Sequence, residues 1–184
     1  MAARHTEPAL LSRREFDALT ERGVLDDARV ELLHGRIVSM SPQKGPHTYG
    51  VTRLVRLLIL ALGDRAVVRA QMPLAVSDSS EPEPDVAIVD PGDYLDDHPP
   101  TARLVVEVAD SSVQRDRDKA RLYAAAGVTE YWIVNVPEGV FEVHTEPSAE
   151  GYGRVTRHGR GAVLRVPGFA DVGIAVADVL PPAR

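Results

Sequence analysis

The sequence has 184 residues, of which 44% are hydrophobic, and a net charge of −6. This size and apolar content predict one domain over residues 1–184, with about residues 1–10 as a loose lead-in, and exclude a disordered chain. The absence of cysteine excludes disulfides, cysteine-based zinc sites and a thiol nucleophile. No apolar run reaches membrane-spanning length, and the first residues lack a signal-peptide core. We therefore expect a soluble cytoplasmic protein with no membrane partner.

The first part of the chain predicts a helix, a hairpin and a longer helix. Ser12–Glu15 has the form of a capping box and begins a short helix that ends before Gly23. Residues 29–40 predict two short strands joined by a tight turn. Residues 51–62 carry apolar side chains at helical spacing, and Gly63 follows as the cap.

The second part predicts a sheet with a helical crossover. The expected strands are 66–72, 85–89, 104–108, 130–135 and 140–144, with a helix over 113–126 and further strands and a short helical turn near the end. A strand–helix–strand unit requires a parallel pair, whereas the short turns favour antiparallel pairs. The fold class is therefore α/β, with a central mixed β-sheet flanked by helices.

Two carboxylates interrupt the apolar pattern of neighbouring strands. Glu107 lies within the run 104–108, and Asp85 directly follows Pro84 at the start of the preceding strand. A buried carboxylate costs several kcal/mol, by order of magnitude, unless it is paired or bound to a cation. Asp85 and Glu107 could therefore share one hard divalent cation. The alternatives are that Asp85 is a turn residue and that Glu107 belongs to a buried ion pair.

The helix over residues 113–126 adds a lysine to this pattern. Asp116, Lys119 and Tyr123 share one stripe of the helix, which we expect to face the sheet, while Arg117 and Arg121 face solvent. A partly desolvated lysine beside carboxylates can orient water or stabilise the pentavalent phosphate that forms during phosphoryl transfer. The plainer interpretation is that Lys119 reaches out to solvent along the interface.

Several segments carry a resemblance to a known family. Pro84–Asp85 with Glu107 resembles the PD-(D/E)XK nuclease signature, although the position of its usual lysine is occupied by Ala109. Longer stretches resemble the Uma-two family of restriction-endonuclease-like proteins, in which the lysine has moved to the following helix. These stretches are Val105 to Ser112, Asp116 to Lys119, Tyr123 to Val134, Glu31 to Val38 and the region of Met40 to His47. The likeness extends from about Leu11 to Val179.

The resemblance implies a restriction-endonuclease-like core and a set of site residues. Asp85 and Glu107 would be metal ligands, the Val108 carbonyl a third ligand, and Lys119 the catalytic lysine. The residues expected to support them near the same cleft are Glu31, His47, Gln71 and Asp116. The implied activity is Mg²⁺-dependent hydrolysis of phosphodiester bonds in nucleic acid, with Mn²⁺ as an alternative cofactor, DNA as the expected substrate and a homodimer as the expected assembly.

Two other function classes remain open at this point. The first is a module on a nuclease-like fold that binds nucleic acid or a protein partner without cutting. The second is a hydrolase of another class, such as a glycosidase, with Asp85 and Glu107 as acid and base.

The negative charge is concentrated in one segment. Residues 78–97 contain eight acidic and no basic side chains, so the other residues sum to 21 − 19 = +2. The acidity thus belongs to the segment that supplies Asp85, and does not exclude nucleic acid elsewhere. Candidate phosphate contacts are the arginine groups Arg53 and Arg56; Arg115, Arg117 and Arg121; and Arg154, Arg157, Arg160 and Arg165.

Overall fold

The computed structural model describes residues 9–26 and 28–182 and contains the following elements. The first half comprises α1 (Arg13–Glu21), β1 (Val30–Leu33), β2 (Arg36–Ser39), α2 (Gly45–Leu62), the 3₁₀ helix η1 (Gly63–Arg65), β3 (Val67–Ala70) and β4 (Val86–Val89). The second half comprises β5 (Leu104–Ala109), α3 (Val113–Ala125), β6 (Glu130–Asn135), β7 (Val140–Ser148), β8 (Gly151–Gly159), β9 (Val163–Val166), β10 (Phe169–Ala175) and α4 (Val176–Val179).

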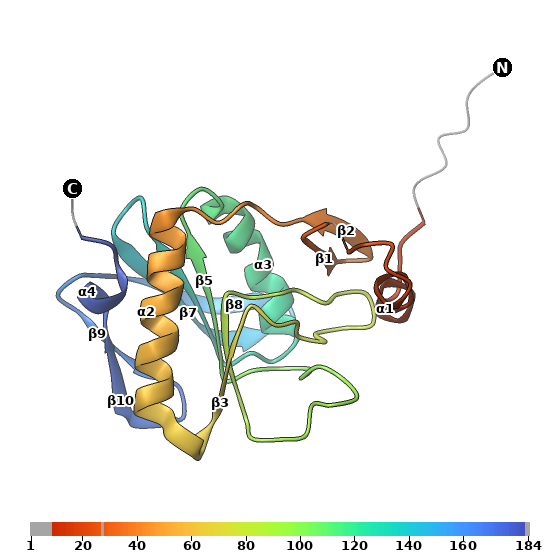
Figure 1. The fold of residues 1–184 in the computed structure, drawn as a ribbon. Coiled ribbons are helices and arrows are strands. Elements are labelled where there is room, and N and C mark those ends of the chain that lie inside the picture. Colours follow the sequence, from red (N-terminus) through yellow and green to blue (C-terminus); the bar gives the residue numbers. More distant parts are fainter. Residues whose placement is uncertain (1–8, 27, 183–184) are drawn as a thin grey trace.

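The central sheet has six strands in the order β3-β4-β5-β6-β7-β8 (Figure 1). Only β5 and β6 are parallel, and the helix between them is α3; the other neighbours are antiparallel. The sheet is therefore mixed and flanked by helices, which confirms the predicted fold class. Two small antiparallel pairs, β1-β2 and β9-β10, accompany it.

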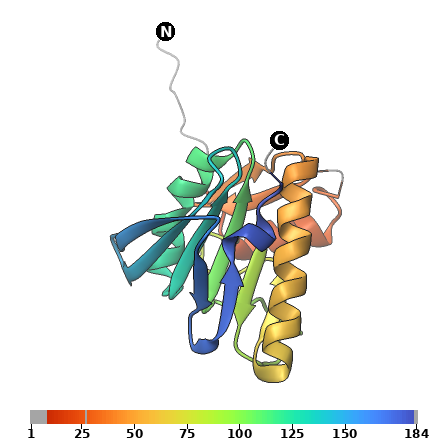
Figure 2. The same ribbon diagram turned by 90° about the vertical axis from the view of Figure 1, so that its left-hand side faces the viewer.

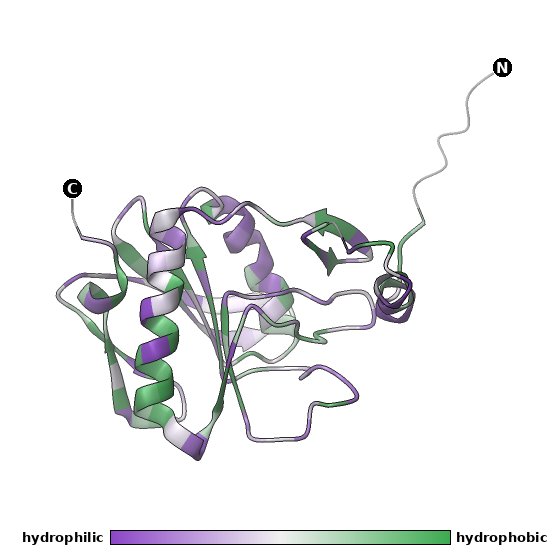
Figure 3. Cartoon of the chain, viewed as in Figure 1, coloured by the Kyte–Doolittle hydropathy of each residue, from purple (hydrophilic) through white to green (hydrophobic). Residues whose placement is uncertain are grey.

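The two faces of the sheet are covered by different elements. Along β5, Leu104, Val106 and Val108 pack in one core cluster with α2, β10 and α4, and Figure 2 shows these elements on the same side of the sheet. Val105 and Ala109 pack in a second cluster with α3. Apolar residues follow the strands and one side of α2 (Figure 3). Because successive side chains of a strand alternate, Glu107 has to point toward α3.

Helix α2 lies close to β5 at its N-terminal part because position 50 is glycine. A Cβ atom on Gly50 would lie 2.9 Å from Val108 Cγ1, which is shorter than side chains tolerate. The buried stripe of the helix continues through Leu54, Leu58 and Leu62. The apolar side chains of α2 extend beyond the stripe that contacts the sheet. Ile59, which belongs to the apolar helical pattern of residues 51–62, is therefore 51% exposed.

Some predicted boundaries differ from the structure for local reasons. Strand β3 ends at Ala70 instead of continuing to residue 72, because Gln71 adopts a left-handed backbone with φ of 53°. Ser112 precedes α3 but makes no side-chain cap; its hydroxyl donates to Asp116 Oδ2. Residues 1–8 of the expected lead-in lie outside the described residues. No helix in the described part of the chain is both long and apolar enough to cross a membrane.

The acidic segment holds the β1–β2 hairpin in place. Leu32 and Glu81 exchange two backbone hydrogen bonds, so the hairpin is anchored beside residues 77–83. The Glu81 side chain is only 5% exposed, and its nearest cation, Arg13 of α1, lies 3.8 Å away. Burial, reinforced by Asp17, raises the pKa of Glu81 to about 7, although Arg13 acts in the opposite direction.

The change Glu81→Gln should remove a pH dependence of stability. Between about pH 4.5 and pH 7 the folded chain keeps a proton on Glu81 that the unfolded chain has released, so the free energy of unfolding falls as the pH rises. Glutamine has no proton to lose. We expect the variant to exceed the wild type by about 2 kcal/mol at pH 8 and to match it at pH 4, as measured by urea unfolding. Identical pH profiles for the two proteins would contradict this assignment.

Candidate active site

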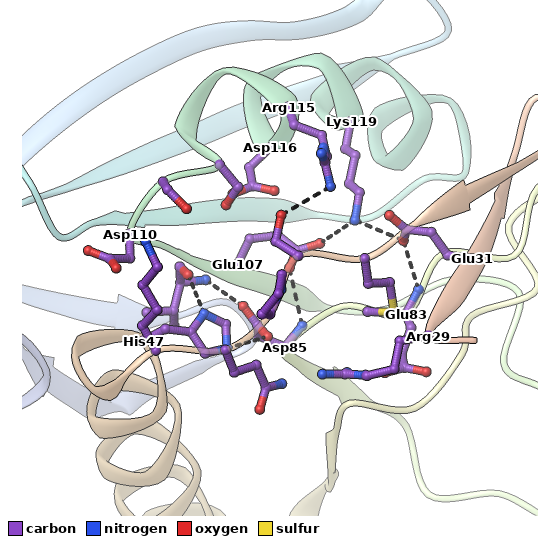
Figure 4. A pocket seen from close by; sticks show the side chains of 18 residues that line it. Arg29, Glu31, His47, Glu83, Asp85, Glu107, Asp110, Arg115, Asp116 and Lys119 are labelled. Atoms are coloured by element: carbon purple, nitrogen blue, oxygen red, sulfur yellow. Dashed lines mark hydrogen bonds and ion pairs between the residues drawn. The ribbon is translucent and has the colours of Figure 1, made fainter. Parts of the chain in front are cut away.

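Polar side chains from five segments converge in one cavity (Figure 4). Its walls come from β1, the start of α2, the loop before β4, β5 and the first part of α3. Five charged side chains in it are less than 9% exposed: Glu31, Asp85, Glu107, Asp116 and Lys119. The structure thus brings together the residues that were singled out from the sequence as pattern violations.

The pairing of β4 with β5 sets the two expected ligands side by side. Val86 pairs with Val106, so the next position along the ladder places Asp85 beside Glu107. The backbone N–H of Asp85 donates to Glu107 Oε2 at 3.3 Å, and the N–H of Val108 donates to Asp85 Oδ2 at 2.8 Å. The backbone of each strand therefore orients the carboxylate of the other.

Lys119 approaches the pair from α3, as the helical stripe predicts. Its Nζ donates to Glu107 Oε1 at 3.2 Å and to Glu31 Oε2 at 2.8 Å. The hydroxyl of Tyr123, one helical turn later, also donates to Glu107 Oε1 at 3.2 Å. Sequence analysis placed Tyr123 on this stripe but assigned it no part in the site.

Glu31 enters from the β1–β2 hairpin. Besides the ammonium of Lys119, its Oε2 accepts the backbone N–H of Glu83 at 3.3 Å. The side chain is 2% exposed, so Glu31 is an internal partner of Lys119 and not a surface residue of the strand. The hairpin is thus part of the site.

His47 enters from the first turn of α2 and contacts two of the expected ligand groups. Its Nδ1 lies 2.7 Å from the Val108 carbonyl oxygen, and its Nε2 lies 3.2 Å from Asp85 Oδ1. The nearby Asp85 carboxylate raises the pKa of His47, and burial partly opposes this rise. The imidazole therefore lies against the carboxylate of Asp85 and does not face solvent.

The buried charges of the cavity are not balanced. Burial raises the pKa of Glu107 well above its usual value, although Lys119 acts in the opposite direction. Burial likewise raises the pKa of Asp116 to about 6, against the hydrogen bond from Ser112. Burial disfavours the charge of Lys119, but the nearby Glu107 and Glu31 carboxylates raise its pKa above the ordinary value overall. Lys119 is therefore a fixed cation among an excess of carboxylates.

The mouth of the cavity carries basic side chains that sequence analysis did not single out as a group. Arg29, Lys44 and Arg115 line it together with the acidic Glu83 and Asp110, and Arg29 forms an ion pair with Glu83. Arg115 was one of the candidate phosphate contacts. Arg117 is exposed, as expected, but its guanidinium forms an ion pair with the buried Glu142. The mouth residues share no sequence pattern that could have identified them, since they come from three separate segments.

Gln71 does not line the cavity. Its left-handed backbone directs its N–H to the carbonyl oxygen of Asp85 at 3.1 Å. Its contact with the site is therefore through the backbone of Asp85.

The oxygen atoms that face the cavity are of the type that a hard divalent cation binds. Carboxylate oxygens of Asp85 and Glu107 and the Val108 carbonyl are the ligands that Mg²⁺ and Mn²⁺ accept. The excess of buried carboxylates over cations also favours an added positive charge. Within the described residues, no group of three or more His, Asp or Glu side chains is arranged so that it could hold a metal ion, so the backbone carbonyl and water would have to supply positions.

Comparison with known proteins identifies the family and the fold of the chain. Residues 13–177 match the model of the Uma2 family, described as "Putative restriction endonuclease". A crystal structure from Anabaena variabilis ATCC 29413, described as a putative nuclease belonging to DUF820, is similar with a TM-score of 0.69 and 16% sequence identity, covering 82% of this chain and 88% of that one. That likeness concerns the fold, and no curated protein matches the sequence. Because the family model spans most of the chain, the protein belongs to the Uma2 family.

Proposed function

We propose that the protein is an endonuclease that uses a divalent cation, Mg²⁺ or Mn²⁺, to hydrolyse phosphodiester bonds of nucleic acid, with DNA as the expected substrate. The observation that supports this most is the convergence of Asp85, Glu107 and Lys119 in one buried cluster under a basic mouth. Membership of a family described as "Putative restriction endonuclease" agrees with it.

The two carboxylates, with the Val108 carbonyl, would hold the cation. When bound, a divalent cation polarises the scissile phosphate and lowers the pKa of a water molecule. The protein's part is to keep Asp85 and Glu107 in place before substrate arrives, through the hydrogen bonds from the Val108 and Asp85 backbone N–H groups. Tyr123 adds a third hydrogen bond that fixes the orientation of Glu107.

Lys119 serves as a cation and not as a base. Because Glu107 and Glu31 hold its ammonium in the charged form, it has no lone pair with which to take a proton from water at neutral pH. A fixed positive charge next to the reacting phosphate stabilises the additional negative charge of the transition state. Glu31 positions that charge.

The basic mouth suits a nucleic-acid backbone. Arg29, Lys44 and Arg115 surround an opening whose floor is acidic. Phosphates flanking the scissile bond would contact the mouth, while the scissile phosphate reaches the floor only together with a cation. The separation of basic side chains at the mouth from acidic ones at the floor explains how a chain with a net charge of −6 can act on a polyanion.

The first prediction of this proposal concerns the two carboxylates. Asp85→Asn and Glu107→Gln should each abolish divalent-dependent cleavage, since the amide removes the charge that holds the cation. Asp90→Asn is the matched control, because Asp90 follows the other end of β4 and is exposed. The assay follows cleavage of supercoiled plasmid, linear duplex, single-stranded DNA and RNA by purified protein with Mg²⁺, Mn²⁺ or EDTA. Unchanged cleavage by Asp85→Asn would refute the proposal, and binding without any cleavage would support the non-cleaving module.

The second prediction concerns the charge of Lys119. Lys119→Met keeps the length of the side chain but removes its charge, and should lower kcat by about 10²–10³-fold. The affinity for Mn²⁺, measured by calorimetry, should not fall, because Glu107 loses a competing cation. Arg121→Met, on the exposed side of the same helix, is the control. A loss of metal binding in Lys119→Met with normal urea unfolding would contradict the role assigned to the lysine.

A further inference from the structure

The contacts of His47 determine which of its nitrogens carries a hydrogen. Nδ1 lies 2.7 Å from the Val108 carbonyl oxygen, and a carbonyl can only accept. Nδ1 therefore carries the hydrogen, and in the neutral ring Nε2 offers a lone pair. The ring is brought to this position by α2, which approaches β5 closely at Gly50.

The Nε2 atom is buried and lacks a hydrogen-bond partner among the described residues. It nevertheless lies 3.2 Å from Asp85 Oδ1, so the two atoms are close without being aligned for a hydrogen bond. A lone pair next to a carboxylate oxygen is repulsive, and the repulsion is relieved either by a proton on Nε2, which makes an ion pair with Asp85, or by a metal cation near both atoms.

The spacing of the two atoms fits neighbouring ligands of one octahedral ion. Bonds of about 2.1 Å at right angles place adjacent ligand atoms about 3.0 Å apart. In that arrangement the lone pair of each ligand points at the ion, to one side of the line between the two ligand atoms. This accounts for a close Nε2–Oδ1 contact that is misaligned as a hydrogen bond.

The other nitrogen has the environment usual for a metal-binding histidine. Such histidines ordinarily donate their second N–H to a backbone carbonyl or a carboxylate, which fixes the ring. The Val108 carbonyl provides this acceptor. In this arrangement one lone pair of the carbonyl oxygen orients His47, and the second is left for the ion.

We propose that His47 Nε2 and Asp85 Oδ1 together bind the divalent cation of the site, and that the imidazole ligand makes the site prefer Mn²⁺ to Mg²⁺. The inference rests on the proposed function and adds the ligand that decides which metal is used. Imidazole nitrogen suits first-row transition ions, whereas Mg²⁺ prefers an all-oxygen shell. Glu107 and water would complete the shell.

The test measures metal binding by the full chain without reference to cleavage. Mn²⁺ is titrated and detected by electron paramagnetic resonance, and the bound ion is examined for ¹⁴N modulation by electron spin echo. We expect modulation that changes when the protein is made with ¹⁵N-labelled histidine. His47→Ala should lose it and bind Mn²⁺ about 10–100-fold more weakly, with a smaller loss for Mg²⁺. His158→Ala, whose ring contacts Thr156 on β8, is the control.

The possible failures are distinguishable. If Mn²⁺ binds and Asp85→Asn abolishes binding, but labelled histidine leaves the echo unchanged, then His47 is only an ion-pair partner of Asp85; this inference is overturned and the proposed function stands. If Asp85→Asn binds Mn²⁺ like the wild type, both are overturned. The labelling comparison uses the unaltered sequence, so it holds even if His47→Ala fails to fold.

Discussion

The burial of Glu107 is the constraint on which the rest of the site depends. The alternation of side chains along β5 turns this carboxylate toward α3, into a layer that is otherwise apolar. A carboxylate there requires compensation, and Lys119, Tyr123 and the Asp85 N–H provide it. The carboxylates of the cavity still outnumber its lysine, and this excess is what the proposed cation would neutralise.

The position of the β1–β2 hairpin depends on the same constraint. The ammonium of Lys119 is itself buried, and Glu31 of the β1–β2 hairpin supplies its second carboxylate. The hairpin cannot be moved without exposing that pair, so its anchoring to Glu81 stabilises the position of Lys119 as well as the fold. Stability and chemistry are therefore coupled across segments that lie far apart in the sequence.

Much of the fold and the core of the site could be predicted from the sequence. Periodicity located the elements, and Asp85, Glu107 and Lys119 were recognisable because each violates a local apolar pattern. Contacts between distant segments could not be predicted, since no local pattern encodes that Glu31 meets Lys119, 88 residues later. The predicted end of β3 was wrong because Gln71 has a left-handed backbone. That conformation accompanies the hydrogen bond from its N–H to the Asp85 carbonyl, a contact between separate segments that the local sequence does not reveal.

Under the proposed metal site, the packing of Gly50 against β5 would influence the choice of metal. The missing side chain allows the start of α2 to rest on Val108, and that same contact sets the depth of His47 in the cavity. A methyl group at this position would tilt the helix outward and withdraw the imidazole, while Asp85 and Glu107 stayed on their strands. Relatives could thus exchange one metal for another through a change in the hydrophobic core, with every ligand still present in the sequence.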